Sequence, residues 1–406
     1  MSSLTTLATA AIFILTYAGV ALGRIPGLRL DRAGVALTGA AMMMAVGALS
    51  PQEAYAAIDL DTIVLLLGMM IVVAHLKLSG FFRLVAGWAL TRAHSPGLLL
   101  TAVVVTAGTL SAFLVNDAIC LVMAPLTIEV TRALRRDPLP YLLALAMAAN
   151  VGSTATITGN PQNIIIGAVS HIPYTAFAAV LAPVAAAGLV LVVVVIAVLS
   201  GRELRDTERL VAAPPPVRVH RAQLIKAALV TLGIVGLFFA GVPVAKAAIL
   251  GGALLLVTRA IKARKVYREI DGALLLMFAG LFVVVAGAEK VLLGPDAVAA
   301  VRGLHLDNVW ALTGITAALS NVISNVPAVL ALKPFVGSLG DPSRAWLVIA
   351  MSSTLAGNFT LVGSVANLIV AERARAAGIE ISFLAYCRAG IPLTLLTLGL
   401  GAWWLS

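Results

Sequence analysis

Two similar segments decide the fold: LSAFLVNDAICLVMAP at 110–125 and LSNVISNVPAVLALKP at 319–334. Their Leu-Ser pairs, the asparagines Asn116 and Asn325, and their closing prolines coincide at one offset, since 325 minus 116 and 334 minus 125 both give 209. In each segment an apolar run is interrupted midway by an amide or an acid. Such an interruption at membrane depth favours a re-entrant hairpin, which enters a bilayer and leaves it on the same side.

A second pair of segments follows at a fixed distance, AMAANVGSTATITGNPQNIIIG at 146–167 and AMSSTLAGNFTLVGSVANLIVA at 350–371. Both are apolar and broken by glycine, and the first is also broken by proline. A membrane chain that builds such a polar, broken patch twice is most simply a transporter, whose site lies where the two repeats meet. The aligned pairs, all 204 residues apart, are Thr156 with Thr360, Gly159 with Gly363 and Asn163 with Asn367.

The composition requires a membrane. Of the 406 residues, 61% are hydrophobic and only 11% are charged, and the mean hydropathy is +1.05. Apolar runs of about 20 residues recur, which is the length that crosses a bilayer as a helix. The net charge of +10 does not indicate nucleic acid, because Arg and Lys gather in short loops between apolar runs, as the positive-inside rule expects. Cys120 and Cys387 lack metal-binding spacing, and we interpret them as buried, inert thiols.

We predict an all-α polytopic membrane protein, an inverted repeat of two halves with about ten transmembrane helices, two re-entrant helical hairpins and two discontinuous helices. The first repeat is 1–200, a cytoplasmic linker follows at 201–222, and the second repeat is 223–406. The hairpins are predicted at 98–131 and 310–338, and the broken helices at 141–167 and 345–371. This order places every strongly basic loop on the cytoplasmic side and both termini on the extracytoplasmic side of a bacterial or archaeal inner membrane.

The broken helices supply candidate binding groups. Backbone stays non-helical within a membrane only where protein or water satisfies its N–H and C=O groups. Gly159-Asn160-Pro161 forces a break, because proline removes a donor and glycine tolerates unusual dihedrals. Each break leaves a helix N-terminus with free N–H groups, which suits an oxyanion or a hydroxylated solute. The alternative is that glycine and proline merely kink packed helices. The predicted substrate-binding residues at the breaks and hairpin tips are Asn116, Thr158, Gly159, Asn160, Asn163, Ser324, Asn325, Gly363, Ser364 and Asn367.

Asp117 is the only acid between Leu98 and Thr127. An ionisable group at membrane depth is costly and usually functional, so we predict that Asp117 couples transport to a proton, or to a cation when it is ionised. Its counterpart 209 residues further on is Val326, so the predicted site is asymmetric in charge. The alternative is that Asp117 only caps the hairpin tip.

These residues resemble the ion-transporter superfamily, which holds divalent-anion:sodium symporters, citrate–metal transporters, sodium/proton antiporters and arsenite/antimonite efflux permeases. The resemblance runs over nearly the whole chain and is most specific at the tips Val115-Asn116-Asp117 and Ser324-Asn325-Val326-Pro327. The dicarboxylate branch typically carries Ser-Asn-Thr at both tips, which this chain lacks, so the arsenite permease branch is nearest. Membership implies binding sites at the hairpin tips and alternating access by an elevator-type movement of a transport domain.

The expected function is proton-coupled efflux of arsenite or antimonite by a secondary active transporter. The four motifs hold amides, hydroxyls and one acid, without an arginine to clamp a carboxylate. We interpret the basic loops Arg24–Arg32 and Arg259–Arg268 as topology signals. A sodium/proton antiporter and a sodium-coupled transporter of inorganic or organic anions are alternatives on the same fold. An enzyme is not expected, because the sequence has no HExxH motif and no paired intramembrane acids.

No cofactor or metal is expected, and the coupling ion is expected to be H⁺, with Na⁺ as the alternative. The expected partners are a small inorganic solute and the lipid bilayer. The sequence leaves open a homodimer and a soluble ATPase partner.

Overall fold

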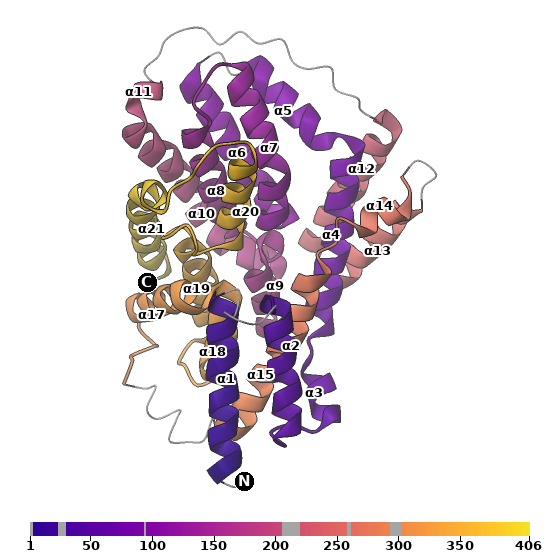
Figure 1. Ribbon diagram of the computed structural model, residues 1–406, viewed down its shortest axis with the longest axis vertical. Coiled ribbons are helices and arrows are strands. Elements are labelled where there is room, and N and C mark those ends of the chain that lie inside the picture. The colour runs from indigo at the N-terminus through magenta and orange to yellow at the C-terminus, as the bar shows by residue number, and fades with distance from the viewer. Residues whose placement is uncertain (1–2, 23–29, 93–94, 205–219, 258–260, 293–302) are drawn as a thin grey trace.

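The computed structural model describes residues 3–22, 30–92, 95–204, 220–257, 261–292 and 303–406, and every regular element in these ranges is a helix (Figure 1). Seven of these helices are long and apolar enough to cross a membrane unaided. The predicted all-α architecture is confirmed. Most of the predicted linker, residues 205–219, lies outside the described residues.

Eight helices of the described chain run unbroken through the body of the molecule: α1 (Ser3–Leu22), α2 (Arg32–Ala45), α4 (Leu60–Ser79), α10 (Tyr174–Leu199), α12 (Arg221–Phe239), α13 (Val244–Leu256), α15 (Gly272–Leu292) and α21 (Phe383–Leu405). Five short helices connect or flank them: α3 (Pro51–Ala57), α5 (Phe81–Arg92), η1 (Ile157–Gly159), α11 (Gly201–Leu204) and α14 (Ala263–Tyr267).

The remaining helices form the hairpins and the broken pairs. The hairpins are α6 (Pro96–Leu114) with α7 (Asn116–Ala133), and α17 (Val309–Ile323) with α18 (Asn325–Val336). The broken pairs are α8 (Pro138–Ser153) with α9 (Pro161–Ser170), and α19 (Pro342–Ala356) with α20 (Val365–Ala376). Three of these elements begin two or three residues before their predicted limits, because Pro96, Pro138 and Pro342 begin helices, where the missing N–H of proline is not needed. The second hairpin begins one residue earlier than predicted and ends two residues earlier.

Two glycine contacts show the pseudo-twofold relation between the repeats. A Cβ on Gly68 of α4 would lie 2.6 Å from the backbone of Ala248 in α13, and a Cβ on Gly280 of α15 would lie 2.6 Å from the backbone of Ala36 in α2. The two glycines are 212 residues apart in sequence (280 minus 68), and so are the two alanines that they approach (248 minus 36). Only glycine permits helices to pack this closely. Each repeat therefore packs a helix tightly against the other repeat.

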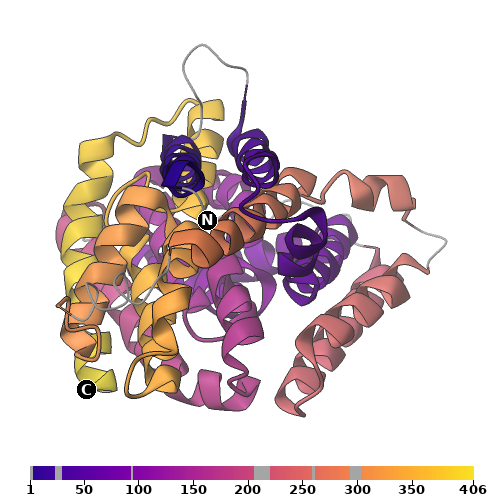
Figure 2. The same cartoon turned by 90° about the horizontal axis from the view of Figure 1, so that it is seen from below.

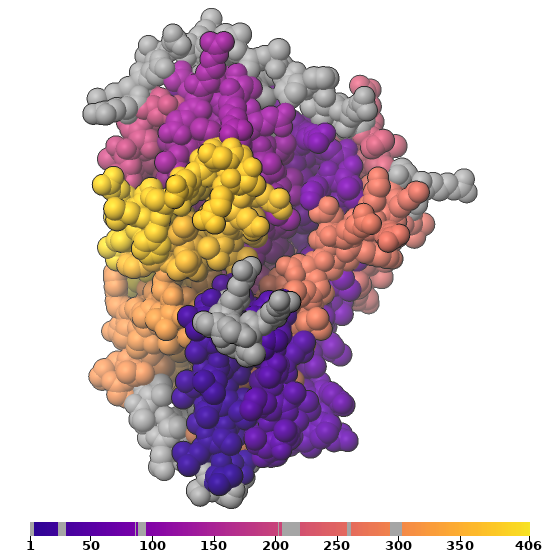
Figure 3. Space-filling view, in the orientation of Figure 1, coloured from indigo at the N-terminus to yellow at the C-terminus, as the bar shows by residue number. Residues whose placement is uncertain are grey.

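The helices of these two pairs, α4 with α13 and α15 with α2, belong to one of two groups of helices in the molecule. Helices α1, α2 and α15 pack together, and α1 and α2 lie side by side on the face shown in Figure 3. Helices α4, α12 and α13 also pack together, while the hairpins and broken pairs pack among themselves and with α10 and α21. Figure 2 shows α12 and α13 on one side of the molecule with α4, and α17–α21 on the other. We call the six helices α1, α2, α4, α12, α13 and α15 the scaffold. The hairpins and the broken pairs, together with α10 and α21, are called the core bundle.

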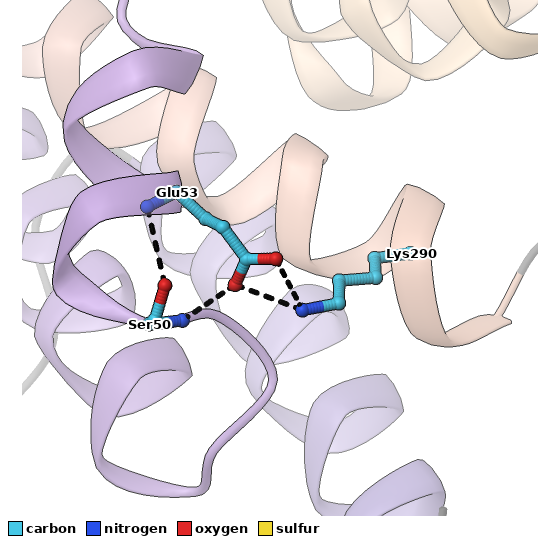
Figure 4. Close-up of polar contacts among 3 residues, drawn as sticks. All are labelled: Ser50, Glu53 and Lys290. Carbon is cyan, nitrogen blue, oxygen red and sulfur yellow. Dashed lines mark hydrogen bonds and ion pairs between the residues drawn. The ribbon is translucent and has the colours of Figure 1, made fainter.

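At one end of the scaffold, a polar contact joins the repeats. Lys290 Nζ at the end of α15 donates to Glu53 Oε1 at 2.7 Å and to Oε2 at 2.8 Å, and the Ser50 N–H donates to Glu53 Oε2 at 2.8 Å (Figure 4). The Lys290 ammonium and the N–H and hydroxyl of Ser50 lower the pKa of the Glu53 carboxyl to about 2. Because both charged side chains are nearly half exposed, the pair fixes geometry more than it adds stability.

Helix α8 lies at the centre of the core bundle. Every residue from Pro140 to Ser153 is buried, and the helix packs against α6, α7, α10 and α20. A helix that is apolar all round is expected in such a position. Its single buried amide, Asn150, is therefore surrounded by protein on all sides.

Candidate functional site

The two hairpin tips have the same unusual backbone. Val115 and Ser324, which are 209 residues apart, have φ angles of 61° and 76°. Positive φ is uncommon outside glycine, and for a β-branched residue such as valine it is a real strain that tends to mark functional sites. This conformation ends one helix and begins the next at Asn116 and at Asn325. Neither α7 nor α18 has a side-chain cap, so the first N–H groups of both helices stay available.

The two breaks are held open in the same way. Asn163 Nδ2 donates to the carbonyl oxygens of Ser153 and Thr156, at 3.1 and 3.0 Å. In the second repeat, Asn367 Nδ2 donates to the carbonyl oxygens at 357 and 360, at 2.7 and 3.1 Å. Non-helical carbonyls inside a membrane protein need such partners. These two amides therefore support the backbone around the site.

Asn150 of α8 connects the first hairpin to the second break. Its Oδ1 accepts from Asn116 Nδ2 at 2.9 Å and from Ser364 Oγ at 3.1 Å, and its Nδ2 donates to Asn367 Oδ1 at 3.0 Å and Asn358 Oδ1 at 2.8 Å. One amide thus fixes groups from both repeats, and its donors and acceptors are used together.

Thr354 of α19 is the counterpart of Asn150, 204 residues further on. Its Oγ1 accepts from Asn160 Nδ2 and from Gln162 Nε2, both at 3.1 Å, and donates to Asn163 Oδ1 at 3.4 Å. Each repeat therefore uses one polar residue of its own broken helix to hold the break of the other repeat. This exchange brings both breaks to the centre of the molecule.

A cavity lies between the two tips and the two breaks, with about 480 Å³ of space not filled by atoms, part of it open to solvent. Four helices begin at its wall: α7 at Asn116, α18 at Asn325, α9 at Pro161 and α20 at Val365. Their positive ends favour electron-rich oxygen atoms in the cavity. The remaining wall residues are Val20, Arg32, Asp117, Gln162, Leu274, Met277, Phe278, Ser324, Val326, Pro327 and Ser364.

Two amide oxygens at this cavity have no partner. Asn116 Oδ1 and Asn325 Oδ1 are buried and accept no hydrogen bond from any described residue. An unsatisfied buried acceptor is costly, and each such group needs an explanation. The two oxygens occupy equivalent positions in the two repeats, because each belongs to the first residue after a hairpin tip with positive φ. A ligand with hydroxyl donors would satisfy them.

The cavity carries one side chain of each charge, Arg32 and Asp117. The sequence interpretation of Arg32 as part of a topology signal is therefore incomplete. Because α2 begins at Arg32 and packs against α15, which forms one cavity wall, the guanidinium is brought to the site. Arg32 and Asp117 are close enough to interact electrostatically but form no direct ion pair. Within the described residues, no cluster of three or more His, Cys, Asp and Glu could hold a metal ion.

The predicted site residues divide into two layers. Five of them line the cavity, namely Asn116, Asp117, Ser324, Asn325 and Ser364. The other six lie behind this wall and hold the breaks: Thr158, Gly159, Asn160, Asn163, Gly363 and Asn367.

The glycines in this second layer act by their small size. A Cβ on Gly159 would lie 2.1 Å from the Ser153 carbonyl oxygen, and a Cβ on Gly363 would lie 2.9 Å from the Gly357 carbonyl oxygen. In contrast, Thr158 acts through its hydroxyl, which lies 2.9 Å from that of Tyr174.

The sequence reasoning missed Arg32, Asn150 and Thr354. A signal existed for the last two, because Asn150 and Thr354 are the fifth residues of the aligned segments 146–167 and 350–371, and both are polar. No comparable signal existed for Arg32, since only the packing of α2 places it at the cavity.

Comparison with known proteins identifies a family and a related fold. The family described as citrate transporter (CitMHS) matches residues 11–344. An uncharacterized transporter of Mycobacterium tuberculosis is 31% identical, with 96% of both chains covered. The silicon efflux transporter LSI3 of Oryza sativa subsp. japonica is 29% identical over 93% of both chains. Among solved structures, the YdaH transporter of Alcanivorax borkumensis aligns with a TM-score of 0.62 at 15% identity, over 99% of this chain and 97% of that one. This last likeness concerns the fold alone.

Proposed function

From the premise that this chain belongs to the citrate transporter family, and is a membrane transporter and not an enzyme, we propose that it exports a small, uncharged, hydroxylated inorganic solute. Arsenite and antimonite, as trihydroxy species, are the first candidates. The movement is coupled to protons and follows an elevator-type alternating access in a bacterial or archaeal inner membrane.

The observation that carries this proposal is the combination of donors and acceptors in one cavity. The uncapped starts of α7 and α18 offer N–H donors, while Asn116 Oδ1 and Asn325 Oδ1 offer unpartnered acceptors. An anion without hydroxyl groups would use the donors and leave both oxygens unsatisfied, at about 1–3 kcal/mol each. A trihydroxy solute both accepts and donates, so it suits the whole wall.

The charges support an uncharged solute. With Asp117 ionised, its carboxylate and the Arg32 guanidinium leave the cavity wall with no formal net charge. A neutral solute then enters without a counter-ion. The rice relative, named for silicon efflux, supports export of a small inorganic solute by this family.

Arg32 and Asp117 also suggest how a proton drives the movement. Arg32 belongs to the scaffold helix α2, and Asp117 belongs to hairpin helix α7 of the core bundle. Their attraction holds the two groups together only while Asp117 is ionised. Asp271, next to the start of α15, is the other charged group that acts on Asp117. Protonation of Asp117 removes both the attraction to Arg32 and the repulsion from Asp271, and so changes the electrostatic interaction between hairpin helix α7 and the scaffold.

Arg32 also favours a second function, sodium-coupled transport of an anion. A guanidinium at the cavity is suited to carboxylate or phosphate, and the family description names citrate. Sodium/proton exchange is the remaining alternative on this fold. These functions differ from the first in their requirement for sodium.

Flux into liposomes tests the proposal. Purified protein is reconstituted, an acid-inside pH gradient is imposed without sodium, and arsenite accumulation is measured as total arsenic. We expect accumulation that collapses when the gradient is dissipated and that protein-free liposomes do not show. Accumulation of citrate instead, dependent on sodium and indifferent to the gradient, would replace this proposal with the second.

A further inference from the structure

A second hollow lies away from the transport cavity and shares no residue with it. It is a groove between α4, α5, α7 and α20, with about 1140 Å³ of unfilled space, part of it open to solvent. We call it the basic groove, because Lys77, Arg83 and Arg373 line it together with one acid, Glu129. Its floor is apolar and includes Phe82 and Leu126. The groove therefore combines charged side chains with an apolar surface.

The basic groove has unused positive charge. Lys77 is paired with Glu269, whereas Arg83 and Arg373 are exposed and form no ion pair with any described residue. Counting Glu129 and Glu269 against the three cations leaves one net positive charge. A guanidinium binds phosphate through two parallel N–H donors. The remaining charge therefore matches a phosphodiester, which carries a single negative charge.

An apolar slot adjoins the basic groove. It lies between α5, α6 and α7, with about 440 Å³ of unfilled space, and its wall includes Leu99, Val103 and Met123. Phe82 and Leu126 belong to both hollows. A hydrocarbon chain that left the basic groove past these two residues would enter the slot directly. Free phosphate would leave the slot empty, and a hydrophilic peptide segment would not fill it favourably.

We infer that the basic groove and the apolar slot together bind one anionic phospholipid, with its phosphodiester between Arg83 and Arg373 and an acyl chain in the slot. The location of the groove agrees with a bound lipid. Lys77 lies in the last turn of α4 and Arg83 near the start of α5, and cations at the end of a membrane-spanning helix lie at the level of the lipid headgroups. The bound lipid contacts α4 and α5 on one side and α7 and α20 on the other. It therefore bridges the scaffold and the helices that carry the first tip and the second break.

Native mass spectrometry of the full chain tests the inference. Detergent-purified protein is titrated with phosphatidylglycerol or with phosphatidylcholine of the same acyl chains. We expect wild type to retain phosphatidylglycerol at least tenfold better than phosphatidylcholine, and R83Q/R373Q to lose most of that preference. The matched control is R264Q/K265Q, which removes two cations from α14 outside both hollows and should behave as wild type.

Two further arms identify the ligand and its chain. Ala102→Leu narrows the slot at a partly exposed position and should weaken phosphatidylglycerol binding while leaving the arginines in place. Glycerol phosphate in excess should not displace the lipid. Equal retention of both lipids by wild type, displacement by glycerol phosphate, or an equal loss in the control and the double variant would each overturn the inference. If the double variant does not fold, R83Q alone decides in the same way.

Discussion

Asn150 gives the sharpest test of how the site is assembled. Replacing it with alanine removes four hydrogen bonds, two through Oδ1 and two through Nδ2. Two of the abandoned partners, Asn116 and Ser364, line the cavity and can turn to water there. The other two partners, Asn358 and Asn367, are fully buried. Asn367 Oδ1 is then left unsatisfied, and Asn358 Oδ1 keeps only a long contact of 3.5 Å from the Tyr386 hydroxyl. At about 1–2 kcal/mol for each buried acceptor, Asn150→Ala should destabilise the protein by about 2–4 kcal/mol.

Unfolding in detergent measures this loss of stability. A conservative variant separates the contribution of the Oδ1 hydrogen bonds from that of the Nδ2 hydrogen bonds. Asn150→Asp keeps the acceptors for Asn116 and Ser364 but removes the donor to the two buried oxygens, so it should lose about as much stability. Ser352→Ala is the control, because Ser352 is also fully buried but its hydroxyl bonds only a carbonyl of its own helix. It should cost about 1 kcal/mol or less.

Transport should change with stability. In Asn150→Ala the Asn116 side chain loses the one hydrogen bond that it makes to a described residue, so its amide no longer has a fixed orientation at the cavity. We expect arsenite flux to fall at least tenfold in the fraction of Asn150→Ala that is folded. If Asn150→Ala matched Ser352→Ala in both unfolding and flux, Asn150 would not hold the two repeats together, and the reasoning would be refuted.

Three more predictions follow from the site and the scaffold. Asp117→Asn should abolish the dependence of arsenite flux on the pH gradient while leaving a folded protein; flux that still follows the gradient would remove Asp117 from coupling. Asn116→Ala and Asn325→Ala should each weaken arsenite binding by about tenfold, one hydrogen bond of about 1.4 kcal/mol, measured by calorimetry; a loss in only one would show that the tips do not share a site. Gly280→Ala should destabilise by about 1–3 kcal/mol, because its Cβ meets the Ala36 backbone, whereas Gly233→Ala, with open space around it, should not; equal melting temperatures would contradict the close helix packing.

The repeats were predictable because their signals are local. A positive-φ tip after an apolar helix, and a break at a glycine such as Gly159 or Gly363, depend on the residues at those positions. These features therefore recur at matching offsets in both halves. The tips at Val115 and Ser324 and the breaks before Pro161 and Val365 lie within the predicted segments.

Such local signals could not predict which amides line the cavity and which ones support the backbone of the breaks. Asn163 and Asn367 looked like ligand-binding amides, yet their Nδ2 groups bond the carbonyls of their own breaks. Asn116 and Asn325 look the same in sequence, yet they line the cavity and their buried Oδ1 atoms accept no hydrogen bond from any described residue. The difference lies in which backbone groups the folded chain brings near each amide.

By itself, the sequence determined that this chain crosses a membrane, that it is built twice, and where its helices turn or break, because hydrophobic run length, glycine and proline act on their own neighbourhoods. Only the tertiary structure decided which polar groups face the cavity. Asn150 reaches partners more than 200 residues away, and Arg32 reaches the site through the packing of α2 on α15. Such contacts depend on which face each helix buries, and in a chain that is apolar on nearly every face the hydrophobic pattern cannot specify that choice.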